Sequence, residues 1–263
     1  MIMAADKLIF AGPSFSGLQK ETPPTVSLKP PCKQGDIYMA SLQKPSVIAI
    51  VDGYFDGVPS VWHKEILWAL SQGIHVLGAA SMGALRAAET DSFGMKGIGA
   101  VYESYRDGVL EDDDEVALLH GPCEMDFVPL SLAMVNVRAT VAKAVERDTI
   151  SDVAANRILQ TAKSQFYKTR TWKTLLEGSA LDLDGLTSTI DLADWLSENE
   201  VDQKKHDAEA LYDFVLNNEF SAPFQPAFVF EETEFWHQRT RKWAKQRQKS
   251  DADPNAGGFR LFG

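Results

Sequence analysis

The chain has 263 residues, of which 26 are Lys or Arg, 37 are Asp or Glu and 44% are hydrophobic, so its formal net charge is −11. This apolar content excludes a disordered chain, and the acidic balance argues against a dedicated nucleic-acid binder. Two cysteines, Cys32 and Cys123, exclude a disulfide framework and fit a reducing compartment. No apolar run reaches the roughly 18 residues of a membrane span, and the N-terminus has no signal-peptide pattern. We therefore expect a soluble cytoplasmic protein with no membrane or nucleic-acid partner.

Strands and short helices alternate in the first part of the chain. Strands are predicted at residues 7–10, 47–51 and 74–77, and helices at 61–72 and 82–89. The run at 47–51 is apolar without interruption, which is typical of a strand buried on both faces. Strands separated by short helices predict an α/β fold with a small, mainly parallel sheet and right-handed crossovers.

The remaining chain changes character, which suggests three regions. Residues 1–125 are expected to form the α/β core, 126–234 a helical region, and 235–263 a basic C-terminal segment with a frayed end after Ser250. Helical periodicity in the middle region is found at 130–147, 152–168, 192–198 and 208–217. A proline-rich stretch at 23–31 is expected to be a surface connector.

The C-terminal segment is basic, whereas the rest of the chain is acidic. From Phe235 onwards there are seven Lys and Arg against two Asp, a net charge of +5. Two interpretations remain open: a solvated helix or arm, and a segment that docks onto an acidic partner or a neighbouring subunit.

The segment around Ser81 is the most informative for chemistry. This serine follows a buried strand, has small neighbours and opens a helix, as the nucleophile does in a nucleophile elbow. The backbone N–H groups of Met82 and Gly83 would then face a developing oxyanion at the start of the helix. Alternatively, Ser81 is simply the N-cap of that helix.

A nucleophilic serine needs a base, and the candidates near in sequence are Lys64, His63 and Asp52. A lysine acts as a base only where burial or nearby positive charge lowers its pKa to about 7–8. Lys64 could instead form an exposed helix pair with Glu65, and His63 could have a structural role. The acidic run at 111–115 could bind a hard cation, although a solvated loop is the simpler interpretation. No metal or cofactor is expected.

Seven segments of the first 125 residues carry a resemblance to one family. They are FAGPS at 10–14, GDIY at 35–38, IVDGYF at 50–55, WHKEIL at 62–67, AASMGALRAAE at 79–89, FGM at 93–95 and DDEVA at 113–117. Together they resemble the TfuA-like family. The helical half and the tail carry no segment that matches it.

The resemblance implies a function in peptide thioamidation. TfuA-like proteins accompany YcaO enzymes, which convert a backbone amide to a thioamide, and are credited with hydrolysing the C-terminal thiocarboxylate of a ThiS-like sulfur carrier through a Ser–Lys pair. Ser81 matches the family serine, and Lys64 is the match expected for its lysine. Arg86 could offer positive charge to the anionic thiocarboxylate, or could pair with Glu89 at i,i+3. Two rival functions are a non-catalytic adaptor between YcaO and its peptide, and an esterase-like serine hydrolase.

Overall fold

A five-stranded parallel sheet forms the centre of the computed structural model, which describes residues 6–18, 21–179 and 189–252. The strands are β1 (Lys7–Phe10), β2 (Val26–Lys29), β3 (Val47–Ile50), β4 (His75–Ala79) and β5 (Lys96–Ile98). Their order is β2-β1-β3-β4-β5, and every neighbouring pair is parallel. The α/β fold with a small parallel sheet that the sequence predicts is confirmed.

Helices cover both faces of this sheet. On one face lie α1 (Asp36–Ser41), α2 (His63–Ser71) and α3 (Met82–Thr90), and on the other lies α9 (Gln203–Asn217). Each face buries alternate residues of the central strands, as the twofold repeat of a strand requires. In β3, for example, Ile48 and Ile50 join the first core, whereas Val47 and Ala49 join the second.

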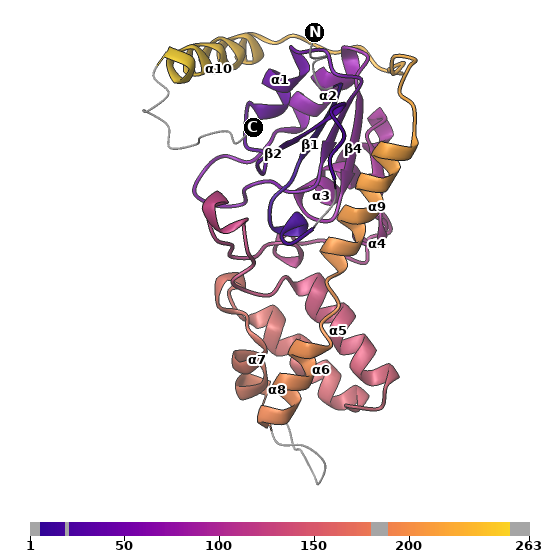
Figure 1. Cartoon of the computed structure of the whole chain (residues 1–263), viewed down its shortest axis with the longest axis vertical. Coiled ribbons are helices and arrows are strands. Elements are labelled where there is room, and N and C mark those ends of the chain that lie inside the picture. The colour runs from indigo at the N-terminus through magenta and orange to yellow at the C-terminus, as the bar shows by residue number, and fades with distance from the viewer. Residues whose placement is uncertain (1–5, 19–20, 180–188, 253–263) are drawn as a thin grey trace.

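A separate helical lobe lies below the sheet in Figure 1. It contains α5 (Met134–Glu146), α6 (Asp152–Ser164), α7 (Trp172–Ser179) and α8 (Thr189–Glu198), which enclose an apolar core of their own. Helix α9 then runs from this lobe back along the sheet (Figure 1). The remaining short elements are α4 (Ala100–Arg106) and the 3-10 turns η1 (Pro13–Phe15), η2 (Asp91–Phe93), η3 (Asp113–Glu115), η4 (Cys123–Met125) and η5 (Tyr167–Thr169).

The basic segment forms α10 (Glu234–Ala252), which crosses the end of the molecule beside α1 (Figure 1). Its Trp236 and Trp243 are buried against the aromatic rings of α1 and α2. Both tryptophans lie on one side of the helix, while Arg241, Lys242 and Lys245 are exposed. Buried aromatic area therefore holds a highly charged helix onto the sheet domain.

The structure adds elements that local patterns did not predict. Strand β2 lies within the proline-rich stretch expected to be a connector, and β5 lies in a glycine-rich stretch where no strand was expected. Helix α9 contains the predicted helix at 208–217 but begins earlier, and of the two arrangements open for the helical region, packing on the sheet or a separate lobe, it adopts the first. The predicted frayed end falls outside the described residues beyond Ala252. Within the described ranges, no helix is both long and apolar enough to cross a membrane.

Candidate functional site

Ser81 lies on a strained turn between β4 and α3. The preceding residue, Ala80, has φ +65°, and the Ser81 N–H donates to the Ala79 carbonyl at 2.7 Å, the three-residue hydrogen bond of a γ-turn. A γ-turn with positive φ is rare and strained for a residue with a Cβ, and such strain tends to occur at functional sites. The Ser81 side chain makes no capping hydrogen bond to α3. The hydroxyl is therefore not used as an ordinary helix cap.

The start of α3 is held very close to the sheet. A Cβ added to Gly83 would lie 1.7 Å from the Ile50 carbonyl oxygen, so only glycine allows this approach. The Gly83 N–H donates to the Val51 carbonyl at 3.2 Å. It is thus already used, which corrects the prediction that it serves an oxyanion. The Met82 N–H donates to no described residue, so this amide remains the candidate oxyanion donor at the positive end of α3.

Ser81 lines a cavity of about 280 Å³ at the carboxyl edge of the sheet. Ligands of open α/β sheets bind at this edge, where the loops that follow the strands meet. Four of the polar side chains around the cavity come from distant parts of the chain: Asp52 after β3, Ser81 after β4, His120 in a loop, and Lys204 in α9. The cavity therefore brings together a serine hydroxyl, a carboxylate and two possible bases.

Lys204 has the environment that a neutral catalytic lysine requires. Lys204 is only 2% exposed, and its Nζ donates a hydrogen bond to the Val116 carbonyl at 2.8 Å. Burial lowers the pKa of Lys204, against the opposing attraction of Asp52 and Asp202. A neutral amine has a lone pair as well as its hydrogens, so Lys204 can donate to Val116 and still accept a proton from within the cavity.

Asp52 holds the turn η1 at the edge of the cavity. Its Oδ2 accepts hydrogen bonds from the N–H groups of Gly12 (2.8 Å) and Ser14 (3.0 Å), and its Oδ1 accepts the Ser14 hydroxyl at 2.7 Å. These bonds fix the turn η1 above the end of β3. Asp52, which the sequence offered as a possible base or supporting residue, lines the cavity after β3, and its hydrogen bonds are to Gly12 and Ser14.

His120 is a second possible base at the cavity. Its Nδ1 lies 2.7 Å from the Gly121 carbonyl, which can only accept, so Nδ1 carries a proton; in the neutral imidazole the lone pair is then on Nε2. Aromatic contacts with Tyr54 and Phe127, at ring-centroid distances of 6.0 and 5.8 Å, orient the imidazole. The sequence analysis did not single out this histidine.

The structure does not bring Lys64 to Ser81. Lys64 lies on the outer side of α2, where its Nζ is 3.5 Å from the Thr233 hydroxyl and 5.2 Å from the centre of the Phe230 ring. It is not among the residues that line the Ser81 cavity. The predicted Ser81–Lys64 pair is therefore not formed, because a helix places only one of its faces against the sheet and Lys64 is on the other.

His63 and Arg86 are also committed elsewhere. His63 Nε2 and Arg86 Nη1 lie 2.7 and 2.6 Å from the same Glu89 carboxylate oxygen. Arg86 Nε also donates to the Val61 carbonyl at 3.0 Å. Of the two interpretations of Arg86, the structure bears out the pair with Glu89. Neither His63 nor Arg86 lines the Ser81 cavity.

The acidic run at 111–115 is ion-paired to the helical lobe. Glu115 accepts two hydrogen bonds from Arg138, both at 2.9 Å, and Lys163 contacts Asp112, Asp114 and Glu115. The run that the sequence suggested to be a solvated loop is therefore an acidic joint, a segment whose ion pairs connect it to the helical lobe. Cys32 is fully buried, and burial raises its thiol pKa well above the usual value, so it stays protonated and unreactive.

Lys204 was missed because it is far from Ser81 in the sequence. A signal was nevertheless present: Lys204, Ala208, Leu211 and Val215 follow the i, i+4, i+7, i+11 spacing of one helix face. The last three are fully buried. A lysine that begins an otherwise apolar stripe is a candidate for a buried, functional amine.

Comparison with known proteins finds the family that the sequence resembles, over a range that begins later than the first of the seven segments and extends into the helical region. No curated protein matches the chain. A family model described as TfuA-like protein matches residues 52–171, a range that includes Asp52, Ser81 and His120 but ends before Lys204. Over these residues, the chain is similar to the TfuA-like protein family.

Proposed function

We propose that this protein hydrolyses the C-terminal thiocarboxylate of a ThiS-like sulfur carrier and so supplies sulfide for YcaO-dependent peptide thioamidation. The match of residues 52–171 to the TfuA-like family supports YcaO-associated thioamidation as the setting. The observation that carries the hydrolase proposal is the buried amine of Lys204 on the same cavity as the uncapped hydroxyl of Ser81. This pair replaces the one expected from sequence.

The proposed reaction adds water to a thiocarboxylate and yields a carboxylate and hydrogen sulfide. The Ser81 Oγ attacks the thiocarboxylate carbon while neutral Lys204 accepts the hydroxyl proton. The tetrahedral oxygen faces the Met82 N–H and the positive end of α3. The C–S bond then breaks, and the Lys204 ammonium gives its proton to the leaving sulfur.

Water completes the cycle. Lys204, neutral again, takes a proton from a water molecule that attacks the ester carbonyl of acyl-Ser81. The Ser81–acyl bond breaks, the proton returns to the Ser81 oxygen, and the carrier leaves as a carboxylate. Release of sulfide next to a bound YcaO enzyme would raise its local concentration, as effective molarity does for any tethered reactant.

The test is sulfide release from a thiocarboxylated carrier. The Ser81→Ala and Lys204→Met proteins should each lose about a thousandfold or more of kcat/KM, since the two groups act as one unit. Lys204→Arg should fail equally, because a guanidinium keeps its proton at any accessible pH. Lys64→Arg is the matched control and should retain the rate of the unchanged protein. Circular dichroism and thermal unfolding confirm that each variant is folded.

Several results would contradict the proposal. Undiminished hydrolysis by folded Ser81→Ala would remove the nucleophile, and loss on Lys64→Arg with a normal Lys204→Arg would restore the pair expected from sequence. Binding of YcaO and carrier without any sulfide release by the unchanged protein would favour the non-catalytic adaptor. Retained activity in Lys204→Arg would remove Lys204 as the base. Loss of activity in His120→Gln would then identify His120 as the base.

A further inference from the structure

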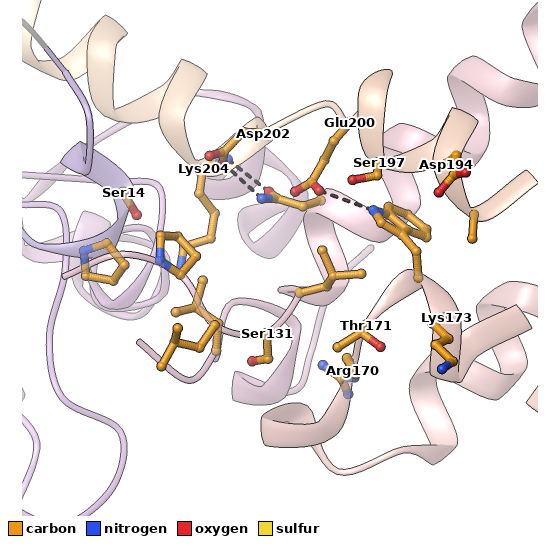
Figure 2. Close-up of a pocket in the computed structure, with 18 residues that line it drawn as sticks. Ser14, Ser131, Arg170, Thr171, Lys173, Asp194, Ser197, Glu200, Asp202 and Lys204 are labelled. Carbon is orange, nitrogen blue, oxygen red and sulfur yellow. Dashed lines mark hydrogen bonds between the residues drawn. The ribbon is translucent and has the colours of Figure 1, made fainter. Parts of the chain in front are cut away.

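A second, larger cavity adjoins the Ser81 cavity. It has a volume of about 410 Å³ and lies between the sheet and the helical lobe. Pro13, Leu118 and Lys204 line both cavities, so the two meet at the buried lysine. Figure 2 shows Ser14 and Lys204 at one end of the second cavity, and Asp194 and Lys173 at the other. The second cavity therefore lies next to the Ser81 cavity, where a chain attached to a ligand at Ser81 would run.

The inner end of the second cavity is rigid. The Asn136 amide donates to Asp202 at 2.9 Å, and its oxygen accepts the Lys204 N–H at 3.2 Å. These bonds join α5 to the start of α9 and are drawn as dashed lines in Figure 2. Further out, the Trp172 indole N–H donates to Glu200 at 3.2 Å. The cavity is therefore a preformed site whose walls come from two parts of the fold.

One side of the outer part of this cavity is acidic. Asp194 and Glu200 line the cavity, and neither forms an ion pair in the part of the chain that the structure describes. The opposite rim carries Lys173, whose side chain is 80% exposed and lies 4.0 Å from Glu177. Two unpaired carboxylates beside an indole form a surface that attracts a cationic side chain.

We propose that the second cavity binds the extended peptide segment that precedes the reactive acyl group, and that a Lys or Arg of this segment lies against Asp194 and Glu200. The identity of the acyl end rests on the proposed function, whereas the peptide site itself does not. When the acyl group is bound at Ser81, the chain attached to it must occupy a neighbouring space. The cavity beyond Lys204 offers that space, with polar side chains and with carboxylates complementary to a cation. A small thioacid would occupy the Ser81 cavity alone.

Binding is measured without catalysis. The probe is a fluorescein-labelled synthetic peptide of about ten residues with two central lysines and a C-terminal carboxylate, titrated by fluorescence anisotropy into the full-length Ser81→Ala protein. Adding Ser197→Trp, which fills the cavity from α8, should weaken the affinity about tenfold or more. Glu198→Trp is the matched control: it is exposed on the same helix, does not line the cavity, and should leave binding unchanged. A peptide with glutamates in place of the lysines should bind about tenfold more weakly, and Asp194→Lys with Glu200→Lys should reverse this preference.

Turnover separates this proposal from the proposed function. In the protein with Ser81 intact, Ser197→Trp should raise KM for the peptide thiocarboxylate and leave hydrolysis of thioacetate unchanged. Equal binding by the Ser197→Trp and Glu198→Trp proteins, or no difference between the two peptides, would overturn the peptide site. Normal charge-selective binding without any hydrolysis would instead overturn the hydrolase and leave the peptide site standing.

Discussion

The amine of Lys204 is held by the carbonyl of Val116, at 2.8 Å from Nζ to the oxygen. Val116 directly follows Glu115, which is 3% exposed and is fixed by Arg138 and Lys163. The position of the proposed base therefore depends on ion pairs between the acidic joint and the helical lobe. These charged groups are positioning residues, because they act on Lys204 through Val116.

Removing one of these ion-pair partners should reduce catalysis without affecting substrate binding. Arg138→Met leaves the buried Glu115 with Lys163 as its cation, and we expect a loss of about 1–3 kcal/mol in unfolding free energy. The kcat for sulfide release should fall several-fold while KM stays constant, because the Val116 carbonyl that holds Lys204 loses its anchor. Arg106→Met, which removes an exposed pair with Asp107, is the control. A fall in stability with unchanged kcat would make the joint purely structural.

The strained turn before Ser81 should tolerate glycine but not a β-branched residue. Ala80 is fully buried at φ +65°, so Ala80→Val should cost about 2 kcal/mol or more and should displace the Ser81 hydroxyl. Ala80→Gly should keep unfolding free energy within about 1 kcal/mol, because relief of strain offsets the added freedom of the unfolded chain. Urea unfolding and the rate of sulfide release check both. A fully active Ala80→Val protein would show that the turn does not aim Ser81.

Glu65 should make the protein less stable as pH rises toward neutrality. Burial raises the pKa of Glu65 to about 7, although the N–H groups of Gly35, Tyr38 and Trp62 oppose the shift. Between its ordinary pKa near 4.5 and about 7, the folded state keeps a proton that the unfolded chain releases. The stabilisation is full below that window and is lost through it, by up to about 3 kcal/mol.

The measurement compares unfolding free energy against pH in Glu65→Gln and in the unchanged protein. In Glu65→Gln, the unfolding free energy should lack the part of its decrease between pH 4.5 and 7 that Glu65 causes. Glu103→Gln, at an exposed position of α4, should follow the unchanged protein. Parallel curves for Glu65→Gln and the unchanged protein would contradict the shift.

The exposed basic face of α10 should contribute to partner binding rather than to catalysis. Reversing Arg241, Lys242 and Lys245 to glutamate should leave sulfide release unchanged and weaken a YcaO complex about tenfold at low salt, with the difference vanishing at high salt. Lys44→Glu with Arg147→Glu, at exposed positions elsewhere, is the control. Pull-down and calorimetry check the prediction. A tight RNA complex that weakens steeply with salt would contradict the choice of a protein partner.

Local patterns in the sequence predicted strands β1, β3 and β4 and the turn at Ser81. The apolar run at 47–51 predicted β3, and the small residues around Ser81 predicted the turn that the structure contains. Such features are local because a buried strand needs an unbroken apolar run and a tight turn needs small side chains. Strands β2 and β5 escaped prediction because they are only three or four residues long and contain or adjoin residues unfavourable to strands.

Only the tertiary structure decided which lysine shares a cavity with Ser81. Lys64 is the nearer of the two in sequence, yet α2 turns it toward Thr233 and the C-terminal segment. Lys204 reaches the cavity because α9 leaves the helical lobe and packs on the second face of the sheet, where its apolar stripe is buried. Lys204 begins that stripe, and the buried area of the stripe fixes which face of the helix turns inward. The sequence spacing determined which side chains share a face of α9. The packing of α9 on the sheet decided that this face contacts the sheet core and the Ser81 cavity.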